Sequence, residues 1–322
     1  MAALDMVDAY TLADLAMRMN GKELLDIAKT LSEINPLMDI MYFQEANQAF
    51  AHKGLRELSR PTGTWTELNN GIDAEADVTE PFIEDIGLLE SRSVVDKRLA
   101  ALSGNEAKYR AQRDASHLAG MLSNLGNKFF YGNRATDNSF DGLATRYSDT
   151  TFANFIDGSG SGGDESSIWV IQPGPMKITF VYPKSHQAAG ITSEDLGSQI
   201  VTGKNSKAMR AWVTWHQIHL GLAIYDHRCV QRVANIETSG TTNIVDPDDV
   251  IDALVRMPEM ARTENTYILM NRTLFAQFKK NVKDRVNVNF SAENPYGGTR
   301  RQITFDGIPI IVTDSIVNTE NA

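Results

Sequence analysis

The sequence predicts a mixed α+β fold, and three observations support this class. A helical pattern of apolar residues spans Ser103–Asn133, a run of strand-forming residues spans Met209–Ile236, and helices alternate with strands after Asp246. The connections between these segments are irregular, and the chain contains no internal repeat. This combination is typical of an α+β body.

Composition indicates an ordinary soluble globular protein. Of the 322 residues, 42% are hydrophobic and 22% are charged, which excludes a disordered or collagen-like chain. The single cysteine, Cys229, cannot form an internal disulfide, so we expect a reducing, intracellular environment. Three acids, Asp5, Asp8 and Asp14, precede the first arginine, and no apolar run approaches ~20 residues, so we expect neither a signal peptide nor a membrane helix.

The net charge of -10 argues against nucleic-acid binding as the main task, because phosphate binding needs clustered Lys and Arg. The charge is unevenly placed along the chain. The segment 61–90 holds eight acids and no Lys or Arg, whereas the segment 177–232 holds seven Lys and Arg against three acids. These segments are either two solvated faces or complementary surfaces that meet between copies of the chain.

The first 36 residues read as two short helices, one opened by Thr11 and one carrying Leu24, which form an arm without a core of its own. A hairpin is predicted next. Strands at Thr64–Leu68 and Ala76–Ile86 flank Asn69-Asn70-Gly71, a sequence suited to a tight turn. Such a ribbon is marginal alone in water, so we expect it to project and to lie on a neighbouring molecule.

The segment Ser103–Asn133 predicts one long helix. Ser103 and Glu106 have the spacing of a capping box at its start, Lys128 lies in its last turn, and Gly132 is placed to close it in the left-handed conformation. About 42 Å of helix in a chain with a radius of gyration of about 20 Å would act as a spine for the other elements. The predicted buried stripe is Ala107, Ala111, Ala115, Leu118, Leu122, Leu125 and Phe129.

Two motifs with possible chemistry have simpler explanations. Glycines 158, 160 and 163 have the spacing of a dinucleotide-binding loop, but the strand signal Ile168–Ile171 follows where a helix is required, so we expect a plain loop. His216 and His219 lie three apart in a strand and so face opposite sides, which favours packing over metal binding. His227 and Cys229 are likewise not expected to form a catalytic pair.

After Ile236 the sequence predicts clear caps. Asp246 followed by Pro247 marks a helix start, Thr266–Met270 is a strand, and Asn271 caps a further helix. Residues 294–298 read as a loop, and residues 303–314 read as two strands about a Gly-Ile-Pro corner.

Several short motifs follow one another along the chain: Leu88–Lys97, the predicted spine helix, Phe140–Leu143, Trp215–Ala223, Arg232–Ile236 and Phe305–Pro309. Their order resembles a known family, the major capsid proteins of tailed bacteriophages, in the branch of short-tailed phages related to epsilon15. Each motif alone is weak, and their order is the specific part.

The resemblance implies the HK97-like capsid fold. The implied divisions are an N-terminal arm (1–50), an extended β-hairpin loop (51–95), a peripheral domain (96–245) with the spine helix and the ribbon 209–236, and an axial domain (246–322). In the commoner chain order of this fold, the strand that resembles Gly307-Ile308-Pro309 precedes the ribbon. Here the ribbon comes first, so a rearranged connectivity is expected.

The resemblance also implies the function: a coat protein that self-assembles, as pentamers and hexamers, into the icosahedral shell around the phage double-stranded DNA. No enzyme activity, cofactor, metal, membrane partner or sequence-specific DNA binding is implied. Expected partners are a separate scaffolding protein, the portal and a decoration or cement protein. The expected location is the virion, after synthesis in the host bacterial cytoplasm. The alternatives are a tail or portal subunit, or a cytosolic metal-dependent enzyme.

Some relatives cross-link neighbours through a loop lysine, but segment 61–90 has none, so no cross-link is expected there. The candidate site is instead a contact between subunits, made by the acidic hairpin of one copy and basic residues of the next. The candidate residues are Trp65, Glu67, Asp73, Glu75 and Asp77 on the hairpin, and Lys204, Lys207 and Arg210 on the neighbour.

Overall fold

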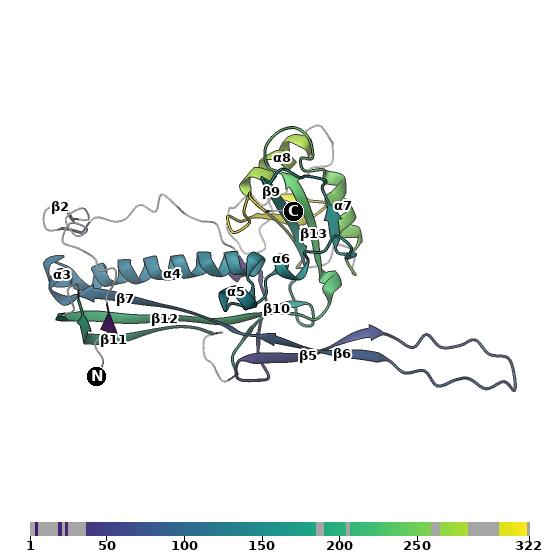
Figure 1. The fold of residues 1–322 in the computed structure, drawn as a ribbon, viewed down its shortest axis with the longest axis horizontal. Coiled ribbons are helices and arrows are strands. Elements are labelled where there is room, and N and C mark those ends of the chain that lie inside the picture. The colour runs from purple at the N-terminus through teal and green to yellow at the C-terminus, as the bar shows by residue number, and fades with distance from the viewer. Residues whose placement is uncertain are drawn as a thin grey trace.

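The computed structural model describes residues 4–5, 19–20, 23–24, 37–184, 190–203, 207–258, 265–282 and 303–320. The molecule is elongated: a long layer of helix and sheet carries a rounder second unit above one end, and a two-stranded hairpin projects beyond that end (Figure 1). Among the described residues, no helix is both long and apolar enough to cross a membrane.

A six-stranded sheet underlies the long layer. Its strand order is β1-β11-β12-β10-β4, and β7 also pairs with β12. The central strand β12 is 17 residues long and pairs antiparallel with β11, β7 and β10 along its course. The strands are β1 (Leu4–Asp5), β4 (Phe43–Glu45), β7 (Gly87–Asp96), β10 (Ile178–Tyr182), β11 (Ile191–Thr202) and β12 (Ala208–Ile224), and the short helix α2 (Leu37–Ile40) precedes β4.

The predicted spine is helix α4 (Glu106–Tyr131), which runs along this sheet (Figure 1). Its 26 residues correspond to about 39 Å. Helix α3 (Lys97–Leu102) precedes it, and α5 (Arg134–Asp137) and α6 (Leu143–Arg146) follow it.

Both ends of the spine differ from the prediction. Asn105, not Ser103, caps the start, because its side chain accepts the N–H of Lys108 at 3.0 Å. Ser103 ends α3 instead, and its hydroxyl donates to the carbonyl of Ala100. At the other end Gly132 has φ of -58° and is not left-handed. A glycine is needed there for space, since a Cβ atom would lie 2.4 Å from the carbonyl oxygen of Phe140.

The predicted apolar stripe is correct only in the second half of α4. Leu125 and Phe129 are buried, whereas Ala107, Ala111 and Ala115 are exposed. In the first half the buried face is shifted to Tyr109 and Arg113, whose guanidinium donates to the Tyr109 hydroxyl at 2.9 Å. Because the buried residue Arg113 is charged, it does not fit an apolar pattern, and the spacing of the alanines predicted the wrong buried face.

The contact between α4 and the sheet involves aromatic rings at both ends. Near the start of the helix, Arg110 lies 4.5 Å above the ring of Trp212 and forms an ion pair with Asp195 at 2.6 Å. Near its end, the ring of Phe129 meets that of Phe180 edge-on at 5.6 Å. Aromatic pairs of this geometry add about 0.5–1.5 kcal/mol beyond area burial.

The middle of the same contact is polar and holds two stacked histidines. His117 of α4 pairs through Nδ1 with the hydroxyl of Ser91 at 2.7 Å, and His216 of β12 pairs with Ser193 at 2.8 Å. The two rings stack with centroids 6.2 Å apart, and Asp114 lies 3.6 Å from Nε2 of His216. Burial, and then the neighbouring His216, lower the pKa of His117 below its ordinary value.

The second unit is a six-stranded sheet of order β15-β16-β14-β9-β13-β8, with two helices on one face. Its strands are β8 (Phe155–Asp157), β9 (Glu165–Ile171), β13 (Val230–Glu237), β14 (Tyr267–Met270), β15 (Thr304–Phe305) and β16 (Ile308–Val312). Its helices are α7 (Pro247–Val255) and α8 (Arg272–Val282), and a single 3-10 turn, η2 (His227–Cys229), leads into β13.

The predicted caps of this unit are confirmed. The side chain of Asp246 accepts the N–H of Asp248 at 3.0 Å, and that of Asn271 accepts the N–H of Leu274 at 2.8 Å. The corner between β15 and β16 is made by Asp306 and Gly307, both at positive φ. The glycine-rich stretch is a loop between β8 and β9, and the predicted loop at 294–298 lies outside the described residues.

Two predictions about chain organisation need revision. The run 209–236 is not one ribbon, because β12 belongs to the long sheet and β13 to the second unit. The predicted boundary at residue 245 also falls within one sheet, since β8, β9 and β13 pair into the same sheet as β14 and β16.

In the arm, Glu23–Leu24 is strand β3, paired with β2 (Met19–Asn20), and not helix; the other predicted helical residues before 37 lie outside the described residues.

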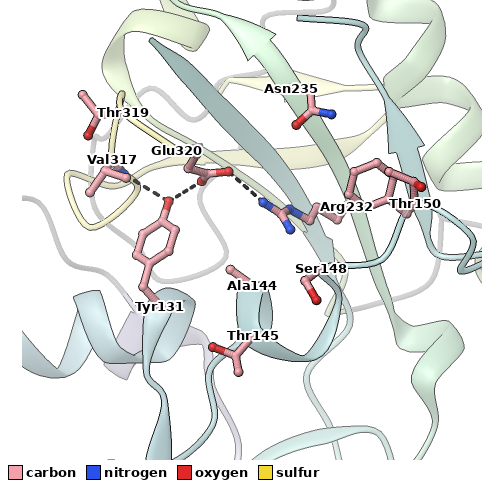
Figure 2. A pocket seen from close by; sticks show the side chains of 11 residues that line it. Tyr131, Ala144, Thr145, Ser148, Thr150, Arg232, Asn235, Val317, Thr319 and Glu320 are labelled. Atoms are coloured by element: carbon pink, nitrogen blue, oxygen red, sulfur yellow. Dashed lines mark hydrogen bonds and ion pairs between the residues drawn. The ribbon is translucent and has the colours of Figure 1, made fainter. Parts of the chain in front are cut away.

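A buried polar network fixes the second unit on the end of the spine (Figure 2). The hydroxyl of Tyr131 donates to Glu320, and the backbone N–H of Val317 donates to that hydroxyl at 3.1 Å. Arg232 of β13 forms an ion pair with the same carboxylate at 2.8 Å and also donates to the Ser167 hydroxyl. The network borders an open hollow of about 530 Å³. Because these charges are buried and paired, the relative orientation of the two sheets is specified.

The perturbed pKa of His117 makes stability depend on pH. The folded pKa of His117 lies below its unfolded value, so the unfolded state binds more protons as the pH falls through about 6.5. Stability is therefore present above this pH and decreases below it. For His117→Gln we expect a smaller loss of unfolding free energy between about pH 7.5 and about pH 5.5. Denaturant melts at several pH values measure this, and equal losses in the two proteins would contradict it.

Candidate interaction site: the projecting hairpin

The projecting hairpin consists of β5 (Ala51–Ser59) and β6 (Val78–Asp85), paired antiparallel. The predicted strand at Thr64–Leu68 is wrong, because residues 60–77 form no ladder. Pro61, which lacks an N–H, follows the end of β5. The predicted turn is correct: Asn69 has φ of 70°, and the N–H of Asn70 donates to the carbonyl of Glu67 at 3.2 Å.

The tip, residues 60–77, is held together by one carboxylate. Glu75 accepts the backbone N–H groups of Thr62 and Gly63 at 2.9 and 3.0 Å and the hydroxyl of Thr64 at 3.2 Å. These bonds, led by that from Gly63, lower the pKa of Glu75 below its ordinary value. Of the predicted contact acids, Glu75 thus already has partners across the two arms of its own tip.

Apolar side chains at the tip are exposed to an unusual degree. Trp65 and Leu68 are 103% and 96% exposed, and Ile72 is 67% exposed. All other residues of the tip are exposed as well. Large apolar side chains gathered in water mark an interaction site rather than a stable monomer surface.

The base of the hairpin is anchored by a buried ion-pair network. Glu84 of β6 receives both terminal nitrogens of Arg146 of α6, each at 2.6 Å, and Arg56 of β5 lies 3.4 Å away. Glu84 is 8% exposed. Arg56 also donates to the carbonyl of Ile224, the last residue of β12, at 2.7 Å. A bidentate arginine–carboxylate pair is directional, so it fixes the angle at which β6 leaves the body.

An aromatic cluster fixes the other side of the base. The ring of Phe82 folds over Gly54 on the paired strand, where a Cβ atom would lie 2.3 Å from that ring. Tyr225 meets the Phe82 ring edge-on at 5.3 Å, and the guanidinium of Arg56 lies 4.1 Å from its centroid. The His52 ring contacts the Tyr225 hydroxyl, and burial lowers the pKa of His52. The hairpin is therefore rigid at its base and solvated at its tip.

The predicted contact residues lie at opposite ends of one molecule. Trp65, Glu67, Asp73, Glu75 and Asp77 are all on the exposed tip. Lys207 and Arg210, both exposed, lie at the start of β12, at the far end of the long axis from the hairpin (Figure 1). Lys204 is outside the described residues. A single molecule does not bring the two sets together.

The histidine and cysteine candidates are structural. His216 is buried under α4, and the nearest acid to His219 is Glu90, at 3.5 Å. Cys229 is buried, and His227 pairs with the Tyr147 hydroxyl at 3.0 Å. Within the described part of the chain, no group of three or more His, Cys, Asp or Glu side chains is arranged to hold a metal.

Sequence reasoning missed the anchor residues Arg56, Glu84 and Arg146. One signal was available: Phe82, Glu84 and Ile86 alternate, which places the acid on a buried face of the strand. Its partner stands 62 residues away, at a separation that a single sequence does not reveal.

A long helix over a sheet, a second sheet unit and a rooted, projecting hairpin define the class: the HK97-like fold of phage shell proteins. The chain of the bacteriophage epsilon15 structure matches with a TM-score of 0.69 and 25% identity, over 100% of this chain and 99% of that one. The bacteriophage JBD30 capsid shares the fold, with a TM-score of 0.50 and 12% identity over 95% and 99% of the two chains. A comparison with curated protein sequences finds no match.

The model of the major capsid protein GP7 family matches residues 19–322, and the chain belongs to this family. It is a major capsid protein of the tailed-phage type, a coat protein that forms the icosahedral shell, rather than a tail or portal subunit. Its place is the shell of the virion.

Breaking the anchor should loosen the hairpin. For Glu84→Ala we expect a loss of about 3 kcal/mol in unfolding free energy, because two buried arginines lose their counter-charge. We also expect faster amide hydrogen exchange in β5 and β6. The matched control is Glu80→Ala, which removes an exposed acid four residues before Glu84 on the same strand. Equal stability of the two variants would contradict the anchor.

Proposed function

We propose that, in the shell, each copy lays its hairpin over the adjacent copy, within pentamers and hexamers of this chain. One observation carries the proposal: the tip is fully exposed while its base is rigidly rooted in its own body. A rigid base directs the tip to one place, and the exposed Trp65 there would contribute about 2–3 kcal/mol on burial.

We further propose that the tip meets the basic residues at the β11/β12 end of a neighbour. Glu67, Asp73 and Asp77 carry the negative charge of the tip, and Lys207 and Arg210 lie exposed at the opposite end of the molecule. Lys204 belongs to the same basic segment in the sequence. Complementary charges at the two ends of a long subunit favour head-to-tail association, in which the tip of one copy meets the basic end of the next.

The proposed division of the chain follows the predicted arm (1–50) and extended loop (51–95). The proposed peripheral domain is the long layer of α4 and its sheet. The proposed axial domain is the second unit, which takes in β8, β9 and β13 as well as the residues after 246. This revision of the predicted boundary at residue 245 keeps the second sheet whole.

The remaining roles are proposed from the family and the charge. The chain acts without catalysis, is made in the host cytoplasm, and works with a separate scaffolding protein, a portal and a decoration protein. The net charge of -10 suits an inner wall that keeps packaged double-stranded DNA mobile instead of binding it.

Removing the Trp65 side chain should impair assembly without affecting folding. Trp65→Ala removes a fully exposed side chain, so the unfolding free energy should change by less than about 0.5 kcal/mol. Shell assembly, followed by sedimentation and negative-stain microscopy, should weaken strongly. The control is Met176→Ala, which is also exposed but belongs to the loop between β9 and β10 and not to the hairpin tip. Normal shells from the Trp65 variant would overturn the role of the tip.

Charge reversal tests the pairing of the tip with its neighbour. Changing Glu67, Asp73 and Asp77 to Lys should block shell assembly, because like charges then meet across the contact. Adding Lys207→Glu and Arg210→Glu to this variant should restore assembly. Shells that form equally well in all variants would refute this contact.

Purified shells should bind DNA only weakly. Double-stranded DNA should associate with them only at low salt, because few phosphates are neutralised. Tight binding that persists at moderate salt would contradict the repelling wall.

A further inference from the structure

The exposed face of α7 is acidic and partly apolar. Asp248, Ile251, Asp252 and Val255 follow one another at helical spacing and all point to solvent; we call them the acidic face. Val255 is 76% exposed and Ile251 is 44% exposed. An aliphatic pair left in water between two carboxylates is a face that gains from being covered.

The exposed face of α8 has the opposite charge. Phe275, Ala276, Lys279 and Lys280 form what we call the basic face: the two lysines and Ala276 are exposed, and Phe275 is half-buried. The ammonium of Lys279 lies 4.6 Å from the centre of the Phe275 ring. Ala276 is small enough to permit close approach of another helix.

The two faces lie toward opposite edges of one sheet. Both helices pack on the same side of it and contact each other: α7 lies against β13 and β9, and α8 reaches β15 through Phe278. The C-cap residue of α7, Arg256, donates to the carbonyl of Phe155 in the edge strand β8 at 3.2 Å. Phe278 of α8 meets Phe305 of the opposite edge strand, β15, at 5.1 Å. Figure 1 shows α7 and α8 on different flanks of the unit.

We propose that, around the symmetry axes of the shell, the acidic face of one copy packs against the basic face of the next. The partner is a second copy of this chain, and the contact is head-to-tail, which closes into rings when the rotation per copy fits. Opposite charges on opposite flanks fix the direction of the ring and oppose pairing of like edges. The inference rests on the proposed function, since it requires neighbouring copies in the shell.

The acids of α7 repel one another in the isolated subunit. Asp249 lies beside the acidic face, and burial, followed by the charges of Asp246, Asp252 and Asp248, raises its pKa above the ordinary value. Part of this charge already stabilises the helix start through the dipole. The remaining repulsion between the carboxylates decreases when the lysines of a neighbour approach, so the ring contact lowers an electrostatic free energy that is unfavourable in the free subunit.

Charge exchange between the faces tests the proposal. The variants are Asp248→Lys with Asp252→Lys, Lys279→Glu with Lys280→Glu, and all four changes together. Each double variant places like charges in every ring contact and should need an about tenfold higher protein concentration for half-assembly, which corresponds to about 1.4 kcal/mol. The fourfold variant restores opposite charges and should assemble at close to the original concentration. Sedimentation velocity at low and high salt measures this.

Misfolding cannot imitate the expected result. Each reversal also opposes a helix dipole, so every variant loses some subunit stability, and the fourfold variant loses most. Recovery of assembly in the least stable subunit would therefore come from the contact alone. The control Glu194→Lys changes an exposed acid of β11 and should leave the salt dependence of ring formation unaltered.

Failure of the inference is distinct from failure of the proposed function. Shells that form in every variant at the same concentration would overturn the contact between α7 and α8 and leave the coat function intact. The same holds if the fourfold variant is as impaired as the two double variants. Normal shells from the Trp65→Ala variant would instead contradict the proposed function and leave the contact between α7 and α8 untouched.

Discussion

The long pairing of β12 is the constraint on which the rest of the structure depends. This one strand pairs with β7, β10 and β11, lies under the spine helix, and ends at the hairpin base before the chain enters the second sheet. Its last carbonyl, that of Ile224, accepts two bonds from Arg56. Helix, hairpin and second unit are thus oriented by the same backbone, and a shift of register in β12 would reposition all three.

Charge is used in two different ways along this molecule. Where a charge must fix a direction, it is buried and paired twice or more, as Glu84 is with two arginines and Glu320 is with Arg232 and Tyr131. Where we propose that a charge serves association, on the hairpin tip and on α7, it is left on the surface. Buried pairs give little net stability but high specificity of geometry, and exposed charges give weak, salt-dependent contacts.

Local signals in the sequence were enough for much of the fold. The helix caps at Asp246 and Asn271, the turn at Asn69 and the length of the spine depend on neighbouring residues, and each was predictable. Features set by distant residues were not. The spine buries Arg113 where apolar periodicity pointed to alanines, and β12 and β13 separate into two sheets although only residues 225–229 lie between them. The anchor Glu84 was missed for the same reason, since its cations come from other parts of the chain.

A shell built from such subunits needs contacts that are accurate in direction and modest in strength. Accuracy comes from within the subunit, because the hairpin root and the two sheets are fixed by buried pairs before any neighbour arrives. Modest strength comes from the surface, where exposed charges and single apolar side chains each contribute little. Many identical weak contacts add up once a ring closes, while a misplaced copy that makes only one of them can still leave. The division between a rigid interior and a lightly charged exterior therefore suits repeated, correctable association better than one strong interface would.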